Sequence, residues 1–191
     1  MKIGLFFGSF NPIHSGHLVI AGYMSEFTDL DQVWLVVSPH NPLKLKNSLL
    51  QDYHRLSLVR AAIGHNRKLK ASDIEFKLPK PSYTIHTLVH LSELHPEHHF
   101  VLILGSDTLS TLGKWKNYEQ ILEHYELYVY PRPGNNGGEF ESHEKVKKVD
   151  APLMEISASF IRESIRNKKD VRYMMPESVW NYIEEMHFYE R

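Results

Sequence analysis

The residues best suited to chemistry lie in a ten-residue stretch, GSFNPIHSGH (8–17), which follows an apolar run at the start of the chain. His14 and His17 are three residues apart, so at the start of a helix their side chains share one face. Backbone amides at a helix N-terminus attract anions, and imidazole nitrogens add hydrogen-bond donors. Gly8 and Gly16 lack side chains where a ligand could approach the main chain. This stretch therefore predicts a site for phosphate oxygens.

Other readings of the same stretch are weaker. There is no G-x-x-x-x-G-K-[ST] phosphate loop, and the dinucleotide fingerprint G-x-G-x-x-G is absent because Phe10 stands at its second glycine. A zinc site is disfavoured because H-S-G-H offers neither a glutamate base nor an evident third ligand. A plain β-α turn with two exposed histidines stays open on these residues alone.

A second stretch, ISASFIR (156–162), also combines polar residues with a helix start. Ser157 or Ser159 is a good N-cap for the helix that follows. This places Arg162 in the first turn, where a cation opposes the positive end of the helix dipole at a cost of about 0.3–1 kcal/mol. A bound anion would reverse that sign, whereas an arginine that simply reaches water would leave it unfavourable.

The elements that must position these residues alternate along the chain. Runs rich in β-branched and aromatic residues predict strands at 2–7, 32–38, 71–76, 98–105, 126–130 and 151–156. Helical patterns lie between them, among others at 17–27, 53–63 and 82–95. This alternation predicts an α/β fold with a doubly wound, mostly parallel sheet and helices on both faces.

The candidate residues follow the predicted strands. Residues 8–17 follow the first run, GSD (105–107) the fourth, PRPG (131–134) the fifth and ISASFIR the sixth. In doubly wound sheets ligands bind beyond the carboxyl ends of the strands, near the point where strand order reverses. No repeat or linker interrupts the chain, so we expect a single domain over 1–191.

Composition narrows the class of protein. The 191 residues include no cysteine, which suits a reducing compartment, and no stretch of eighteen apolar residues that could span a bilayer. With 22 basic and 23 acidic residues, no global field favours nucleic acid or an anionic membrane. We expect a cytoplasmic protein that binds neither nucleic acid nor membrane and holds anions locally.

The first stretch fits G-x-F-x-P-x-H-x-G-H, so the chain resembles the nucleotidylyltransferase superfamily, and the resemblance implies its Rossmann-like fold. The second stretch is similar to that superfamily's I-S-S-T-x-I-R. It departs from the pattern at Ala158, which lacks a hydroxyl, and at Ser159, which keeps one.

Further segments resemble the bacterial nicotinate-nucleotide adenylyltransferases: SPHNPLKLK (38–46), PSYTIHTL (81–88), GSDTLSTLGKWKNYEQIL (105–122), YPRPG (130–134) and MPESVWNYIEEMHFY (175–189). This resemblance implies adenylyl transfer from ATP to nicotinate mononucleotide. The products would be nicotinate adenine dinucleotide and pyrophosphate, in NAD biosynthesis. It implies Mg²⁺ carried by the ATP phosphates, no separate metal site in the protein, small-molecule partners, and a homo-oligomer as one option.

The resemblance also implies residue roles. Contacts to ATP fall on Gly8, Ser9, Phe10, His14, His17, Gly105, Asp107, Ile156, Ser157, Ser159 and Arg162. The catalytic candidates, which stabilise developing charge, are His14, His17, Lys44 and Arg162. Contacts to nicotinate mononucleotide fall on Lys44, Tyr83, Thr84, Asp107, Trp115, Tyr118 and Arg132.

Several alternatives stay open. Trp115 could stack on the pyridine ring, or it could belong to a buried helical stripe with Leu109 and Leu112. The amide mononucleotide could replace the acid, because that choice depends on a few donors. A pantetheine-phosphate adenylyltransferase, or a module that binds nucleotides without turnover, fits fewer of the motifs. An aminoacyl-tRNA synthetase is disfavoured by the absence of K-M-S-K-S and of a basic track for tRNA.

Overall fold

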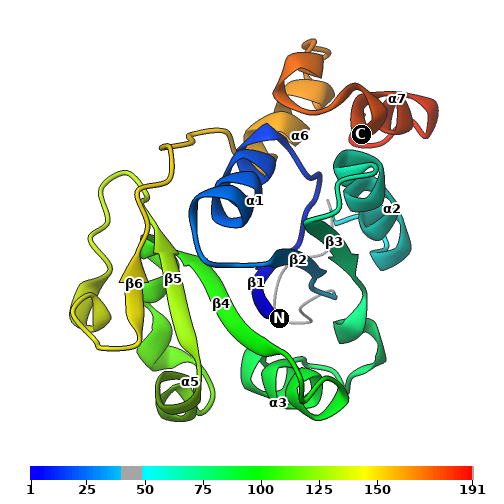
Figure 1. Cartoon of the computed structure of the whole chain (residues 1–191). Coiled ribbons are helices and arrows are strands. Elements are labelled where there is room, and N and C mark those ends of the chain that lie inside the picture. Colours follow the sequence, from blue (N-terminus) through cyan, green and yellow to red (C-terminus); the bar gives the residue numbers. More distant parts are fainter. Residues whose placement is uncertain (40–48, 191) are drawn as a thin grey trace.

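The sheet is parallel throughout. The computed structural model describes residues 1–39 and 49–190. Within them the strands are β1 (Lys2–Gly8), β2 (Gln32–Val37), β3 (Leu69–Ser72), β4 (His99–Gly105), β5 (Glu126–Tyr130) and β6 (Val146–Lys148). They lie side by side in the order β3-β2-β1-β4-β5-β6 (Figure 1). Strand order therefore reverses between β1 and β4, and the predicted doubly wound, Rossmann-like fold is confirmed.

Helices connect the strands and extend the chain beyond β6. The α-helices are α1 (Ser15–Phe27), α2 (Asp52–Ile63), α3 (Thr84–Leu94), α4 (Ser106–Leu109), α5 (Tyr118–His124), α6 (Ala158–Arg166) and α7 (Glu177–Glu185). Short 3₁₀ helices are η1 (Ile74–Lys77), η2 (Leu112–Lys114), η3 (Gly138–Phe140) and η4 (Arg172–Met174). Among the residues that the model describes, no helix is long and apolar enough to cross a membrane.

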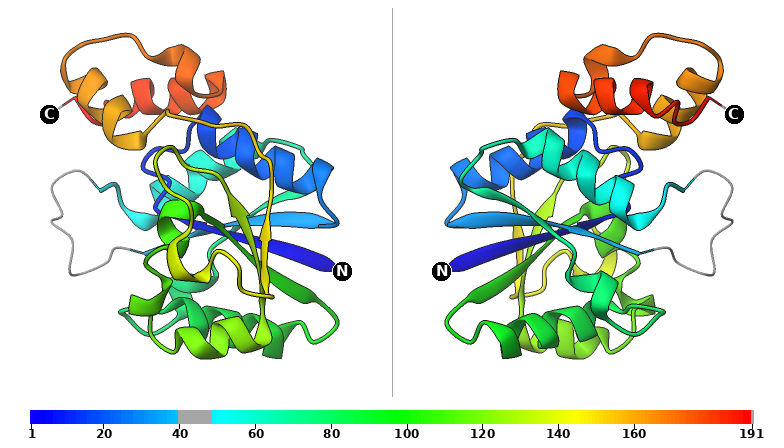
Figure 2. Two further views of the ribbon diagram at one scale, coloured as in Figure 1. Left: turned by 90° about the vertical axis from the view of Figure 1, so that its left-hand side faces the viewer. Right: turned by 90° about the vertical axis from the view of Figure 1, so that its right-hand side faces the viewer.

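The core consists of two apolar layers, one on each face of the sheet. Side chains of α1, α2, α6 and α7 pack on one face, and those of α3, α4 and α5 pack on the other. Along β1, Leu5 lies in one layer and its neighbour Phe6 in the other. Because both faces are buried, the strands read as nearly continuous apolar runs. Figure 2 shows the sheet between its helices, with α6 and α7 forming an outer cap beyond α1 and α2.

Two predicted strands are wrong. The third strand ends at Ser72, and the residues expected to continue it form η1 instead. The run 151–156 forms no strand, although Ala151, Met154 and Ile156 still pack on the core, which explains its apolar pattern. The sixth strand is β6, a short edge strand whose two lysines are exposed. Charged, short edge strands of this kind carry no apolar signal.

Candidate active site

The candidate residues gather where strand order reverses. Gly8 ends β1 and Gly105 ends β4, and these two strands are hydrogen-bonded neighbours. The stretch 8–17 leaves the first of these ends and leads directly into α1. The loop after β5 and the segment before α6 complete a cavity over the same edge. The predicted location at the carboxyl ends of the strands therefore matches the geometry.

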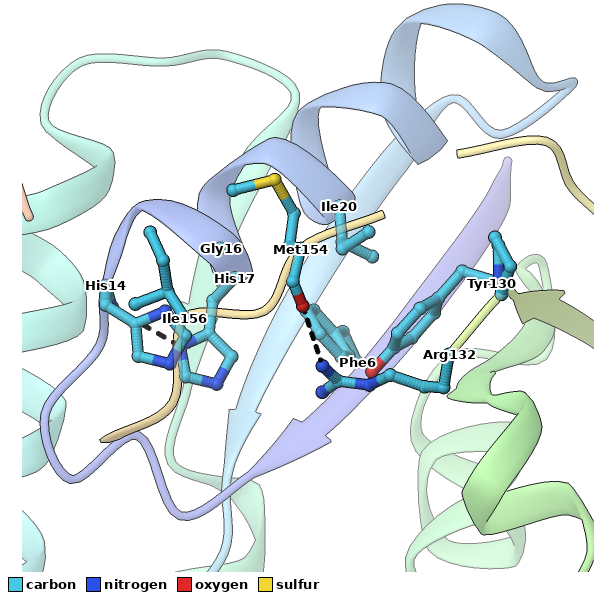
Figure 3. Close-up of a pocket in the computed structure, with 10 residues that line it drawn as sticks. Phe6, His14, Gly16, His17, Ile20, Tyr130, Arg132, Met154 and Ile156 are labelled. Carbon is cyan, nitrogen blue, oxygen red and sulfur yellow. Dashed lines mark hydrogen bonds between the residues drawn. The ribbon is translucent and has the colours of Figure 1, made fainter. Parts of the chain in front are cut away.

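The rings of His14 and His17 lie against each other at the start of α1, tilted by 32°. His14 is the N-cap, and its ring centroid lies 3.8 Å from that of His17 (Figure 3). The backbone N–H of His14 donates to Nδ1 of His17 at 3.3 Å. Because Nδ1 of His17 accepts this bond, a neutral His17 ring carries its hydrogen on Nε2. That nitrogen is therefore a donor available to a ligand.

Both imidazoles are held neutral. Burial, reinforced by the nearby charge of Arg132, lowers the pKa of His14 to about 4. Burial first, then His14 and Arg132, lower the pKa of His17 well below its ordinary value. Nδ1 of His14 is buried and has no hydrogen-bond partner within the described ranges. At neutral pH the pair thus offers uncharged N–H donors rather than imidazolium cations.

Arg132 brings a positive charge to the same cavity. Its Nη1 donates to the carbonyl oxygen of Met154 at 3.2 Å, and its guanidinium lies 5.4 Å from the ring centroid of Tyr130. The cavity is lined by Phe6, His14, Gly16, His17, Ile20, Tyr130, Pro131, Arg132, Met154 and Ile156 (Figure 3). Arg132, which the resemblance assigns to the mononucleotide, lies in the same cavity as the histidines.

Arg162 reaches the loop before α1 from the opposite end of the chain. Its Nη1 donates to the carbonyl oxygen of Asn11 at 2.7 Å, and its Nη2 donates to Ser159 Oγ at 3.2 Å. Ser157 is the N-cap of α6 and accepts from the Phe160 N–H, as predicted. The predicted first-turn position of Arg162 is wrong: it is the fifth helical residue, so the dipole argument weakens.

The two glycines of the first stretch have a packing role inside the loop. A Cβ on Gly8 would lie 2.9 Å from the Phe10 ring, and one on Gly16 would lie 3.0 Å from Nδ1 of His14. Phe10 itself is buried, so its ring anchors the loop in the core. Its backbone has a φ of 45°. The absence of a side chain at these two glycines therefore also seats Phe10 and His14.

Arg55 clamps this loop from beneath, a role that sequence reasoning missed. It is fully buried on α2 and donates to the carbonyl oxygens of Ser9 at 2.6 Å, Ser38 at 2.7 Å and Leu50 at 3.0 Å. Its Nη2 pairs with Asp52 at 2.6 Å. Burial lowers the pKa of Arg55, opposed by that carboxylate. The sequence signal for this clamp was an arginine among the apolar residues that form the buried side of α2.

The C-terminal segment adds a second anchor. The hydroxyl of Tyr189 donates to Asn11 Oδ1 at 2.8 Å, and this contact is buried. Burial raises the pKa of Tyr189, so the hydroxyl keeps its proton. The loop before α1 is therefore held by α2, α6 and the end of the chain together.

Four of the candidate pyridine-nucleotide residues lie on the α3 side of the sheet: Tyr83, Thr84, Trp115 and Tyr118. Tyr83 is the N-cap of α3, and Thr84 is the first residue of that helix. The centroid of the Tyr83 ring lies 4.5 Å from Lys116 Nζ. That contact brings the start of α3 next to the segment of Trp115 and Tyr118. Both of these side chains are half-buried against the core layer, while Leu109 and Leu112 are buried. Trp115 thus packs on the core and still presents a surface.

Three further residues complete the comparison with the sequence. A Cβ on Gly105 would lie 2.4 Å from Asp107 Oδ1, so the carboxylate of Asp107 sits directly over this glycine. Asp107 is exposed, and its Oδ1 lies 3.9 Å from Arg132 Nε. Lys44 lies outside the described residues. Ser106, which sequence reasoning missed, accepts from the Arg132 N–H at 2.9 Å and orients that loop.

Known proteins match the whole chain. The family model described as cytidylyltransferase-like matches residues 5–164. Proteins named probable nicotinate-nucleotide adenylyltransferase from Flavobacterium psychrophilum and Cytophaga hutchinsonii are each 54% identical to this chain. The first match covers 100% of both chains, and the second covers 99% of this chain and 98% of the relative.

Solved structures share the fold. Plasmodium falciparum nicotinic acid mononucleotide adenylyltransferase complexed with NaAD matches with a TM-score of 0.82 at 21% identity, over 99% of this chain and 97% of that chain. A putative nicotinate-nucleotide adenylyltransferase from Vibrio parahaemolyticus matches with a TM-score of 0.73 at 21% identity, over 100% and 96%. At 21% identity these structural matches show a shared fold.

Proposed function

This chain belongs to the cytidylyltransferase-like family, among its nicotinate-nucleotide adenylyltransferases, and we propose that its His14–His17 cavity transfers the adenylyl group of ATP to nicotinate mononucleotide. The products are nicotinate adenine dinucleotide and pyrophosphate, on the route to NAD. The observation that carries the proposal is the convergence of two neutral histidines and Arg132 on one cavity, with Arg162 fixing the loop that leads into it.

The reaction needs positioning more than proton transfer. An oxygen of the mononucleotide phosphate attacks the α-phosphorus of ATP, and the bond from that phosphorus to the bridging oxygen of pyrophosphate breaks. The attacking phosphate is already anionic at neutral pH, so it needs no strong general base. Catalysis then rests on holding two nucleotides in line and on stabilising charge in the leaving pyrophosphate.

The ATP site is proposed to follow the loop, α1 and the start of α6. Nε2 of His17 and the ring of His14 donate to phosphate oxygens, and Arg162 adds positive charge from α6. Backbone contacts come from Gly8, Ser9 and Phe10, and the adenosine is framed by Gly105, Asp107, Ile156, Ser157 and Ser159. Lys44 is proposed as a further phosphate contact.

Arg132 is proposed to meet the mononucleotide where the two substrates join. The phosphate of the nucleophile must approach the α-phosphate beside the histidines, and Arg132 lines that same cavity. Contacts with the Tyr130 ring and the Met154 carbonyl oxygen hold the guanidinium of Arg132 in the cavity. A charge in this position would orient the attacking phosphate.

The pyridine ring is proposed to lie over Trp115. Its half-buried indole is seated against the core, which fixes its plane at low entropic cost. Tyr83, Thr84 and Tyr118 are proposed to supply polar groups to the same nucleotide, since the Tyr83 ring lies 4.5 Å from Nζ of Lys116, the neighbour of Trp115. Stacking on an aromatic ring contributes about 1–3 kcal/mol for a nucleobase, and a similar contribution is expected here.

Mg²⁺ is proposed to arrive with ATP rather than in a protein cage. Asp107 is the carboxylate among the candidate site residues, and the rest of the donor set consists of imidazole, guanidinium, hydroxyl and backbone groups. Such a set suits phosphate oxygens, whereas Mg²⁺ prefers oxygen ligands and commonly keeps waters and substrate phosphates. The ion supplies charge neutralisation to the triphosphate when bound.

A product assay tests the proposal. The enzyme is incubated with ATP, Mg²⁺ and either nicotinate mononucleotide or its amide, and the dinucleotide is identified by mass while kcat/KM is measured. Strong preference for the acid is expected. Equal rates would change the assignment to a dual-specificity enzyme. Binding of both nucleotides without any dinucleotide would overturn the catalytic proposal and favour a nucleotide-sensing module.

A further inference from the structure

A cluster of metal-ligating side chains lies outside the candidate active site, in the turn HPEHH (95–99) between α3 and β4. The His95 N–H closes α3 by donating to Leu91 at 2.9 Å, and the His98 N–H donates back to the His95 carbonyl at 3.0 Å. Pro96 at the second position fixes this turn. The backbone therefore presets the positions of His95 and His98.

The donor atoms of the turn converge on one point. Oε1 of Glu97 lies 3.7 Å from Nδ1 of His95 and 3.3 Å from Nδ1 of His98. The three atoms all lie within 4.8 Å of one another. A tetrahedral ion with bonds of about 2.0–2.1 Å needs ligand atoms about 3.3–3.5 Å apart. Small side-chain rotations would bring all three atoms onto such an ion.

The environment favours an ion over a simple surface pair. Nδ1 of His98 is buried and makes no hydrogen bond within the described part of the chain, although Glu97 is near. The two imidazoles are stacked with centroids 5.4 Å apart, and both rest on Trp34, at 5.8 and 6.4 Å. Glu97 remains 61% exposed, which leaves a path for an ion from solvent.

We propose that His95, Glu97 and His98 form a site for a divalent transition-metal ion of the Zn²⁺ class. Two imidazoles and one carboxylate suit Zn²⁺, Ni²⁺, Co²⁺ and Cu²⁺, whereas Mg²⁺ prefers oxygen ligands. Three protein ligands leave at least one coordination position to water. The aromatic floor of Trp34 and Phe100 holds the rings that the ion requires.

The site is structural rather than catalytic, because of where it lies. It immediately precedes β4, at the amino end of that strand, while Gly105 and the candidate active site lie at its carboxyl end. The next residue, His99, donates its backbone N–H to Met1, so the turn also holds the start of the chain. An ion that binds only the folded turn would raise the melting temperature.

The test uses tryptophan fluorescence, and the part that Trp34 contributes is the part lost in Trp34→Phe, because Trp115 and Trp180 also emit. Protein without an affinity tag is titrated with Ni²⁺ or Cu²⁺ in excess Mg²⁺ and without nucleotide, because added histidines or nucleotides would bind the same ions. Quenching that saturates at one ion per chain is expected, and Zn²⁺ should compete for the site and raise the melting temperature. His98→Ala and Glu97→Gln should each weaken the binding at least about tenfold.

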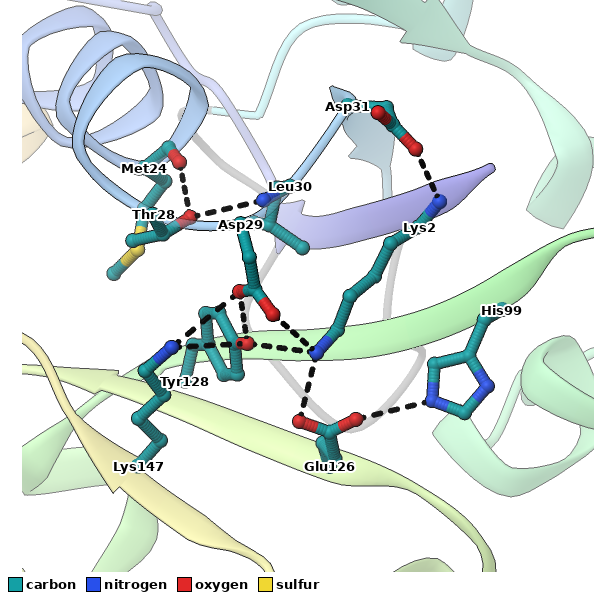
Figure 4. Close-up of polar contacts among 10 residues, drawn as sticks. All are labelled: Lys2, Met24, Thr28, Asp29, Leu30, Asp31, His99, Glu126, Tyr128 and Lys147. Carbon is teal, nitrogen blue, oxygen red and sulfur yellow. Dashed lines mark hydrogen bonds and ion pairs between the residues drawn. The ribbon is translucent and has the colours of Figure 1, made fainter.

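A neighbouring histidine provides the matched control. His99 is exposed and pairs with Glu126 through Nε2 at 3.1 Å, away from the cluster (Figure 4). His99→Ala should leave the titration and the melting shift unchanged, and all three variants should keep the adenylyltransferase rate. The proposed site would be overturned if His98→Ala and Glu97→Gln bound the ion as tightly as the wild type. It would also be overturned if His99→Ala lost as much binding as those two variants. Glu97→Gln alters an exposed side chain, so its result stands even if His98→Ala folds poorly.

Discussion

At the residue scale, the site separates hydrogen-bond donation from charge. His14 is buried, His17 is half-buried, and both are neutral, so they can donate to phosphate oxygens without carrying charge. The positive charge is supplied by the guanidinium groups of Arg132 and Arg162. The Nδ1 contact of His17 also fixes the tautomer of that ring, with its hydrogen on Nε2.

The neutrality of His14 predicts a pH-dependent stability. Folded His14 has a pKa of about 4 against an ordinary value of 6.5, so the unfolded chain binds more protons between these values. The contribution of neutral His14 to the free energy of unfolding is complete above about pH 6.5. It is lost progressively as the pH falls from there through about 4. His14 alone should lower the free energy of unfolding by about 2 kcal/mol between about pH 8 and about pH 5.

Urea denaturation at both pH values measures this effect. His14→Gln should reduce the pH dependence by about that amount, whereas His124→Gln, at an exposed position, should not change it. An unchanged pH dependence in His14→Gln would show that folded His14 titrates like a free histidine.

Arg55 predicts a stability effect coupled to activity. Arg55→Met leaves three backbone carbonyls without their donor and leaves Asp52 with the longer pair to Lys80, at 3.6 Å. We expect a loss of about 3 kcal/mol in the free energy of unfolding, and a lower kcat because the loop of Ser9 loosens. Arg60→Met, at an exposed position of the same helix, should cost much less. Similar urea midpoints for the two variants would contradict the clamp.

At the element scale, α1 contains two glycines that should respond in opposite ways. A Cβ on Gly16 would lie 3.0 Å from Nδ1 of His14, while a Cβ on Gly22 would meet nothing within 4 Å. Gly16→Ala should displace the His14 ring and lower kcat about tenfold or more. Gly22→Ala should keep kcat and raise stability by up to about 1 kcal/mol. Equal kcat values for both variants would show that ring placement is not critical.

The elements also show what the sequence could predict. Buried parallel strands give long apolar runs, so β1, β2, β4 and β5 were predictable. The edge strand β6 was missed because backbone pairing, rather than side-chain burial, holds its lysines in place. The motif residues around His14 and Ser157 were predictable from local spacing. The clamp by Arg55 and the contact between Tyr189 and Asn11 were not, because both join residues far apart in the chain.

At the scale of the whole molecule, the sheet separates a reactive end from a structural end. At the amino ends of the strands, Lys2 Nζ contacts Asp29, Glu126 and Tyr128, each at 2.9 Å (Figure 4). Tyr128 also donates to Asp29, and Lys147 joins both. This network ties β1 to β5, β6 and the segment after α1, far along the strands from the candidate active site.

The network predicts that stability and catalysis can be changed separately. Lys2→Met removes the central cation and leaves Asp29 and Glu126 without it, so we expect a loss of about 2 kcal/mol in the free energy of unfolding. The kcat at a temperature where the variant is folded should equal that of the wild type. Lys77→Met, at an exposed position, is the control. A reduced kcat in folded Lys2→Met would show that the two ends are coupled.

The most direct test of the proposed chemistry is the kcat for dinucleotide formation in His17→Ala and His17→Gln. If Nε2 of a neutral His17 acts as a donor to phosphate, the alanine variant should lose about 10²–10³-fold in kcat while its circular dichroism spectrum stays that of the wild type. The glutamine variant, which keeps an N–H donor but cannot ionise, should recover a large part of that loss. A folded His17→Ala enzyme with the wild-type kcat would contradict the mechanism.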